Sequence, residues 1–299
     1  MTLSTDVPEV GGSSETPTHK YALLAVFIAV LSWGVGPVIV RGISAPFLAF
    51  TPVRMAISVP LLYTVCRLSG GRITRDVWRV SLIPGVIFSL SIICAFASFK
   101  ETSLANATLI ASLNPVLMLF VAPWLLKERV DAAKVVLCLV ALAGVGTVVI
   151  YGQSTTGQSL RGDLLAIVNL FAWTAYSVYV KKVRSANVHP SAFLTVTTSI
   201  SVIILLPVAV ISGADFAQIN GNDWWLILAQ CVIAGLLGML LIAWATRFLD
   251  ATLVALMNLI SPVISSLFAW FLYDQALVGM QILGACVMLA AVAIVVARR

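Results

Sequence analysis

The sequence contains few charged residues for its length. Asp, Glu, Lys and Arg make up 10% of the 299 residues, whereas 61% are hydrophobic and the mean hydropathy is +1.05. Soluble domains carry roughly 25% charged residues, so this chain has too few to cover a surface that faces water. The composition therefore excludes a soluble globular protein and predicts an all-α integral membrane protein with several spans.

Residues for metal, disulfide and catalytic chemistry are also scarce. The two histidines, His19 and His189, lie outside the apolar segments, and the five cysteines form no CxxC pair. The apolar segments contain no Ser/His/Asp set, no His/Glu cluster and no phosphate-binding glycine-rich loop. We therefore expect no metal site, no cofactor, no disulfide framework and no enzymatic activity.

Carboxylates are missing from the middle of every apolar segment. Beyond the first 20 residues, the acidic residues fall in loops or at segment ends: Asp76, Glu101, Glu128, Asp131, Asp163, Asp215, Asp223, Asp250 and Asp274. Several begin a segment, where a carboxylate suits a helix cap. A transporter of cationic drugs would need an acidic group within the bilayer. This pattern disfavours multidrug efflux and leaves both proton coupling and uniport open.

Ten apolar segments have the length of about 20 residues that a helix needs to cross a bilayer. They cover residues 21–41, 46–68, 77–99, 103–126, 131–151, 162–182, 190–212, 223–246, 250–273 and 276–297. Residues 1–20 are rich in Gly, Ser, Thr and Pro and predict a disordered tail. The longest connection, the polar linker 152–161, separates a first five-helix unit (21–151) from a second (162–299).

Basic residues are divided unequally between the two sides of this predicted bundle. Fourteen lie on one side and three on the other, with Arg54 inside a segment, which accounts for all 18. The three are Arg41, Lys100 and Arg161. Because cytoplasmic loops carry the excess of Lys and Arg, both termini are predicted to be cytoplasmic. The net charge of +6 then reflects topology, and nucleic-acid binding is rejected.

A stretch of eight residues occurs twice in the chain. Residues 107–114 read ATLIASLN and residues 251–258 read ATLVALMN, with five identical positions. A proline follows each copy closely, and then a second apolar segment. Since each half has an odd number of spans, the second half enters the membrane from the opposite side. The pattern predicts two inverted five-helix repeats, which are typical of secondary transporters with a substrate site between the halves.

The repeated stretch places amides inside predicted spans. Asn114 and Asn258 occupy equivalent positions, and Ser261 shares a helical face with Asn258. Pro115 and Pro262 each remove a backbone hydrogen bond and predict a kink. Two interpretations stay open: asparagines that bind substrate beside a mobile break, or asparagines that join neighbouring helices. The candidate hinge or kink positions are Gly34, Pro37, Pro115 and Pro262.

Aromatic and amide side chains recur at helical spacing in the segment 162–182. Asn169, Trp173 and Tyr176 share one face, and Trp33 is the counterpart of Trp173 in the first segment. Aromatic groups with polar tips suit a pocket for an apolar or aromatic solute. Packing between helices is the alternative.

Arg54 is the charged residue that lies well inside a predicted span. Its guanidinium could bind a substrate carboxylate, or it could extend towards the outer interface. With it, the candidate substrate-binding residues are Trp33, Arg54, Asn114, Asn169, Trp173, Tyr176, Asn258 and Ser261.

Three short motifs carry a resemblance to a known family: Ser-Trp-Gly at 32–34, Asn-Pro at 114–115 and Lys-Glu at 127–128. With the order of the segments over 21–297, they resemble the drug/metabolite transporter superfamily, in particular its ten-helix branch with two EamA-type repeats and the aromatic amino acid exporters. The resemblance implies an inverted-repeat fold, alternating access and export of amino acids across the cytoplasmic (inner) membrane, aromatic and hydrophobic ones favoured.

The implied partners are a small-molecule substrate and the lipid bilayer, with proton coupling as an option. The segments 131–151 and 276–297 are rich in small residues, which allow close helix approach. They predict a structural support or a dimer contact, so both a monomer and a homodimer remain open. The alternative function is export of drugs or other small metabolites.

Overall fold

The computed structural model describes residues 17–102, 104–126, 132–151, 159–185, 188–273 and 279–297. These residues form helices joined by short turns, and they include no strand. Six helical stretches among them are long and apolar enough to cross a membrane. The predicted all-α integral membrane protein is confirmed at this level, while the count of ten spans stays a prediction.

Five of the six stretches are continuous α-helices: α1 (Pro17–Gly42), α2 (Phe47–Leu68), α3 (Arg75–Glu101), α7 (Leu160–Ser185) and α8 (Pro190–Ile211). The sixth stretch is composite, with α9 (Gly221–Gln230), the π-helix η2 (Cys231–Leu237) and α10 (Gly238–Ala245). The short 3₁₀-helix η1 (Phe216–Gln218) precedes it. A π-helix forms hydrogen bonds five residues apart and is frequent at functional sites, and nothing in the sequence analysis predicted this one.

Both copies of the repeated stretch lie at a break in a helix. The first copy ends where α4 (Leu104–Ala111) gives way to α5 (Asn114–Leu126), and the second where α11 (Ala251–Met257) passes through the 3₁₀-helix η3 (Asn258–Ile260) into α12 (Ser261–Tyr273). A proline is the second residue of α5 and of α12, where a missing N–H is tolerated. The chain breaks where the prolines predicted a kink, and a hinge function stays a prediction.

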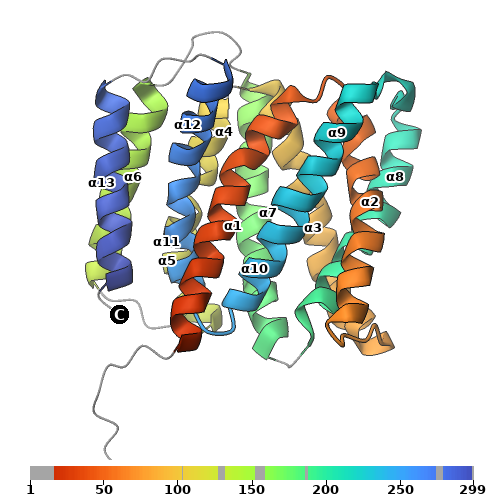
Figure 1. Cartoon of the computed structure of the whole chain (residues 1–299), viewed down its shortest axis with the longest axis horizontal. Coiled ribbons are helices and arrows are strands. Elements are labelled where there is room, and N and C mark those ends of the chain that lie inside the picture. Colours follow the sequence, from red (N-terminus) through yellow and green to blue (C-terminus); the bar gives the residue numbers. More distant parts are fainter. Residues whose placement is uncertain are drawn as a thin grey trace, which may run out of the picture.

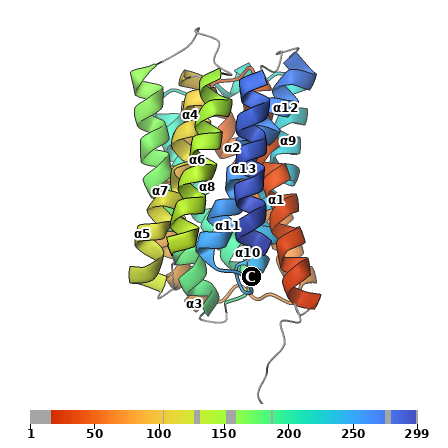
Figure 2. The same ribbon diagram turned by 90° about the vertical axis from the view of Figure 1, so that its left-hand side faces the viewer.

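The broken helices run in opposite directions through the bundle. Figures 1 and 2 show α4 above α5 but α12 above α11, so the chain descends through the first pair and ascends through the second. Two further apolar helices, α6 (Ala132–Tyr151) and α13 (Gly279–Ala297), pack against each other at one edge of the molecule.

Some predicted segments lie outside the described residues. These are residues 1–16 of the predicted tail, residues 152–158 of the linker, and the polar corners 127–131 and 274–278. The described boundaries differ slightly from the predicted ones, because α1 begins at Pro17 and α7 at Leu160. Helix α1 therefore extends by about one turn, and α7 by two residues, into stretches whose polar composition suggested coil.

The first helix of each predicted five-helix unit packs mainly against helices of the other unit. Helix α1 contacts α9, η2, α10 and α12, whereas α7 contacts α3, α4 and α5. Helix α2 packs against α8 in the same manner. The two five-helix units predicted from the sequence are thus interlocked, and no interface separates them cleanly.

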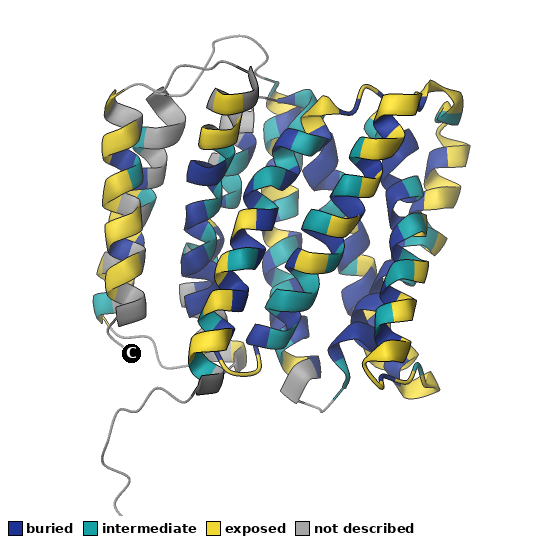
Figure 3. Ribbon diagram, in the orientation of Figure 1, coloured by how far each residue is buried: buried dark blue, intermediate teal, exposed yellow. Residues whose placement is uncertain are grey.

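The exterior of the bundle is apolar. Large hydrophobic side chains that are more than half exposed occur on several helices, among them Ile83 on α3, Phe171 on α7 and Ile203 on α8 (Figure 3). Soluble monomers rarely expose contiguous apolar patches of this kind. Such an outer surface fits hydrocarbon and agrees with a multi-pass membrane protein.

Polar contacts tie both ends of the composite α9–α10 stretch. At its start the buried Asp223 carboxylate accepts hydrogen bonds from the Ser44 N–H (2.7 Å), the Ser44 hydroxyl (2.8 Å) and the Ala45 N–H (3.2 Å). At its end the Lys181 ammonium donates to the carbonyls of Thr246 and Leu249. The predicted capping role of Asp223 thus extends to the loop between α1 and α2.

Close packing of α6 against α13 depends on Gly284. A Cβ added there would collide with the Thr147 hydroxyl and lie 2.6 Å from the Gly144 carbonyl oxygen, whereas a Cβ at Gly279 in the same helix meets nothing within 4 Å. We expect Gly284→Ala to lower the unfolding temperature in detergent by several degrees, because overpacking costs about 1–3 kcal/mol. Gly279→Ala is the control; equal effects of the two substitutions would contradict this packing.

Candidate functional site

A cavity of about 220 Å³ lies inside the bundle. A cavity of roughly 150 Å³ accommodates a benzene ring, so this one is large enough for a small organic solute. Its lining comes from α1, α2, α3, α4, α7, η2, η3 and the starts of α5 and α12, together with residues of α9–α11. Every helix break described above contributes to it.

Arg54 of α2 lines this cavity and is 4% exposed. Its guanidinium carbon lies 5.2 Å from the centre of the Phe96 ring, and Nη1 is 3.8 Å from the Met55 sulfur. Gly235 of η2 leaves room for it, since a Cβ built on Gly235 would lie 3.0 Å from Nη2. Among the described residues, no acidic side chain forms an ion pair with Arg54. The guanidinium is thus buried beside the cavity and does not extend to the outer interface.

Trp33 of α1 and Trp173 of α7 meet edge to face inside the bundle. Their ring centres are 5.4 Å apart at an interplanar angle of 82°, a favoured arrangement for aromatic pairs. The Trp33 indole N–H donates to the Ala234 carbonyl of η2 at 3.0 Å. A Cβ on Gly238 would lie 2.5 Å from the same indole nitrogen, so Gly238 is needed for this approach. The structure brings together two tryptophans that lie 140 positions apart in the sequence.

The other two predicted residues of α7 contact different neighbours, and Tyr176 is the more buried of them. The Asn169 amide oxygen accepts a hydrogen bond from Ser91 at 2.7 Å. Tyr176 is 2% exposed and packs against the rings of Phe88 and Phe193. Asn169 lines the large cavity, whereas Tyr176 lines a smaller one.

Asn114 and Asn258 are the first residues after the two helix breaks, and they line both cavities. The Asn114 amide donates to the Thr174 hydroxyl at 3.2 Å. The Asn258 oxygen is buried and has no hydrogen-bond partner among the described residues. Ser261 follows one turn later and lines the large cavity. The equivalent amides therefore differ: one is satisfied by a neighbouring helix and the other is not.

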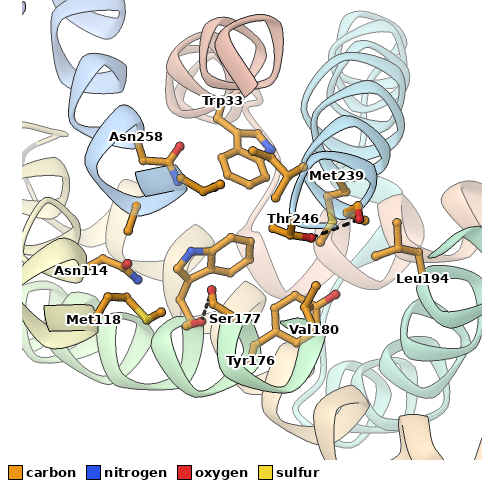
Figure 4. A pocket seen from close by; sticks show the side chains of 15 residues that line it. Trp33, Asn114, Met118, Tyr176, Ser177, Val180, Leu194, Met239, Thr246 and Asn258 are labelled. Atoms are coloured by element: carbon orange, nitrogen blue, oxygen red, sulfur yellow. Dashed lines mark hydrogen bonds between the residues drawn. The ribbon is translucent and has the colours of Figure 1, made fainter. Parts of the chain in front are cut away.

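The smaller cavity lies beyond the tryptophan pair and has a volume of about 50 Å³. Figure 4 shows Asn114 and Asn258 on one side of it and Thr246 and Leu194 on the other. It is too small for a benzene ring by the comparison above. Both cavities share Trp33, Trp173 and the two asparagines, which therefore form the layer between them.

The predicted hinge residues fall at close contacts. A Cβ on Gly34 would lie 2.5 Å from Ile264 of α12, and the Gly34 carbonyl accepts a hydrogen bond from Ser265. Pro37 and Pro262 line the large cavity. Gly34 is tightly packed against α12, whereas the two prolines line the cavity, and movement at these positions stays a prediction.

Sequence reasoning missed Gln230, the last residue of α9. It is 4% exposed, lines the large cavity, and its side-chain oxygen has no hydrogen-bond partner among the described residues. A polar amide within an otherwise apolar span was the available signal. Ser91, Ser112 and Phe96 also line the cavity unpredicted. In the described part of the chain no three His, Cys, Asp or Glu side chains gather.

The sequence was compared with models of known protein families. The model of the EamA-like transporter family matches residues 20–150 and residues 160–297, which together make up most of the chain. The chain belongs to the EamA-like transporter family. This confirms the coarse resemblance to the drug/metabolite transporters.

Similar EamA-family proteins are named for different solutes. The pseudopaline exporter CntI of Pseudomonas aeruginosa is 25% identical over 275 residues, which cover 91% of this chain and 94% of that protein. A "probable amino-acid metabolite efflux pump" of Escherichia coli is 25% identical over 291 residues, covering 90% and 92%. The riboflavin transporter ImpX of Fusobacterium nucleatum is 23% identical over 220 residues, covering 71% and 73%.

A solved crystal structure shows the same fold. It matches this EamA-family chain with a TM-score of 0.76 and 21% identity, and the match covers 94% of this chain and 99% of the other.

The unpaired Arg54 generates a prediction about stability. A buried guanidinium without a counter-ion opposes folding, so replacing it with an apolar side chain of similar length removes that cost. We expect Arg54→Met to raise the unfolding temperature in detergent by a few degrees. The exposed Arg72→Gln is the control. A lower unfolding temperature for Arg54→Met would show that the guanidinium supports the fold.

Proposed function

We propose that this EamA-family protein is a secondary transporter that exports amino acids across the cytoplasmic membrane, with aromatic and hydrophobic ones favoured. The observation that carries the proposal is the buried Arg54 beside a cavity of about 220 Å³ with aromatic walls. A guanidinium binds a carboxylate through two parallel hydrogen bonds. An amino acid would supply the missing counter-ion through its carboxylate and place its side chain against Trp33, Trp173 and Phe96.

Alternating access between two inverted repeats is part of the proposal. Equivalent helices pair with each other, α2 with α8 and α6 with α13, and the broken helices run antiparallel. This pairing supports a ten-span bundle with a two-fold axis in the membrane plane, as in other secondary transporters. Trp33, Trp173, Asn114 and Asn258 would then form the barrier between the two cavities, and rearrangement at the helix breaks would open them in turn.

The excess of basic residues orients the protein with both termini in the cytoplasm. In this orientation the end of α2 faces the cytoplasm and the end of α8 faces outward. The large cavity, near the C-terminal halves of α1 and α3, then lies in the outer half of the bundle.

Cysteine labelling tests this orientation. Ser69 and Ser212 are exposed residues at the ends of α2 and α8. In a variant whose five cysteines are replaced by alanine, we expect a membrane-impermeant maleimide to label Ser212→Cys in intact cells. Ser69→Cys should react only after the membrane is permeabilised. The reverse pattern would overturn the orientation.

Transport itself is tested by counterflow in liposomes at equal pH on both sides. Vesicles that contain the protein are loaded with one amino acid, and the uptake of labelled amino acids is measured. We expect uptake of aromatic amino acids, reduced by about tenfold to a hundredfold in Arg54→Gln, because hydrogen bonds to a charged group contribute about 1.5–3 kcal/mol. Arg54→Lys should retain part of the activity, and Arg72→Gln should match wild type.

The panel also carries solutes other than amino acids, because EamA-family relatives are named for pseudopaline and riboflavin as well as amino-acid metabolites. Uptake of those solutes without amino acids would favour the alternative, an exporter of drugs or other metabolites. Equal uptake by wild type and Arg54→Gln would remove Arg54 from the site. Uptake that needs a pH gradient would show proton coupling.

A further inference from the structure

Three buried polar atoms at the large cavity have no hydrogen-bond partner among the described residues. They are Nε of Arg54 on α2, the side-chain oxygen of Gln230 at the end of α9, and the side-chain oxygen of Asn258 at the start of η3. Buried polar groups in folded proteins are nearly always paired. The described residues hold seven such atoms in all, the other four on His19, Thr51, Ser81 and Tyr176. The three named here share one cavity, which points to a ligand that supplies their missing partners.

The chemistry of these groups is mixed. Arg54 offers donors and a positive charge, whereas the oxygens of Gln230 and Asn258 are neutral acceptors. A carboxylate satisfies the first, and an ammonium group, which has three donors, satisfies the other two. A carboxylic acid without an amino group would leave both oxygens unpaired, and an amine without a carboxylate would leave the guanidinium without a counter-ion.

We propose that Gln230 and Asn258 bind the amino group of the substrate, so that the cavity selects zwitterionic α-amino acids over carboxylic acids that lack this group. This inference rests on the proposed function and deepens it, because it assigns the second half of the head group. It also makes Gln230 a specificity-determining residue.

No described group pairs with the side-chain oxygen of Gln230 or of Asn258. Gly36 of α1 faces the Gln230 amide, and a Cβ built on Gly36 would lie 3.5 Å from its nitrogen and 3.8 Å from its oxygen. These distances are ordinary van der Waals contacts, so the Gln230 amide lies against α1 while Gln230 lines the cavity. Asn114, the counterpart of Asn258, already donates to Thr174, so the recognition is asymmetric between the two repeats.

The neutral character of the acceptors has a further consequence. A carboxylate in place of Gln230 would add a negative charge to the cavity that Arg54 lines and would compete with the substrate carboxylate for the guanidinium. An amide accepts from an ammonium group and leaves that charge in place. The cavity can therefore hold both ends of a zwitterion without an acidic side chain.

The test compares an amino acid with its analogue lacking the amino group. Counterflow and isothermal titration in detergent are measured with phenylalanine, 3-phenylpropionate and 2-phenylethylamine, in wild type, Gln230→Leu and Asn258→Leu. We expect wild type to prefer phenylalanine over 3-phenylpropionate by about tenfold or more and to reject the amine. Each leucine variant should lose most of the signal for phenylalanine and little of that for 3-phenylpropionate. Gln218→Leu, an exposed glutamine, is the matched control.

The outcomes separate this inference from the proposed function. Equal handling of phenylalanine and 3-phenylpropionate by wild type, or a preference that survives both leucine substitutions, overturns the inference and leaves amino-acid transport intact. Selective binding of phenylalanine without counterflow supports the inference and overturns the proposed transport. Absence of both binding and counterflow overturns both. The wild-type comparison needs no variant, so a misfolded variant does not prevent a decision.

Discussion

Hydrocarbon offers no hydrogen-bond partners, so every polar group that enters the bilayer has to find one within the protein. Many serine and threonine side chains among the described residues do so locally, by donating to a carbonyl three or four residues earlier. Ser58, Ser89 and Thr174 bond to Arg54, Gly85 and Leu170 in this way. Against this background the unpaired atoms of Arg54, Gln230 and Asn258 stand out. All three residues line the same cavity, which makes that cavity the candidate binding site of the bundle.

Small residues shape that centre. Gly235 and Gly238 let η2 and α10 approach Arg54 and Trp33, and Gly34 lets α1 approach α12. Each removes the volume of a side chain where a large group from another helix has to fit. The carbonyl of Ala234 in the π-helix then accepts the Trp33 indole N–H. The site is therefore made of large side chains that are held in place by glycines on the facing helix.

Much of the fold could be predicted from the sequence, because a single membrane span is recognisable from its apolar composition and length. The long apolar helices, the breaks beside Asn114 and Asn258 and the equivalence of Trp33 with Trp173 follow from apolar length, proline position and repeat symmetry. The contact between the two tryptophan rings is seen only in the structure. The π-helix could not be predicted, since its extra residue per turn leaves no mark on an apolar sequence. Gln230 was not predicted, because it carries no charge and does not belong to the repeated stretch that contains Asn114 and Asn258. Only the fold shows that its oxygen is unpaired.

The interlocked packing of α1 bears on how the protein is made. Its neighbours α9, η2, α10 and α12 are encoded at the far end of the chain. At a synthesis rate of about 5–20 residues per second, α1 waits on the order of ten seconds or more before α9 leaves the ribosome. During that time the face of α1 that later meets these helices lacks them as partners. The finished core therefore cannot be assembled one half at a time, and its completion is tied to the last part of translation.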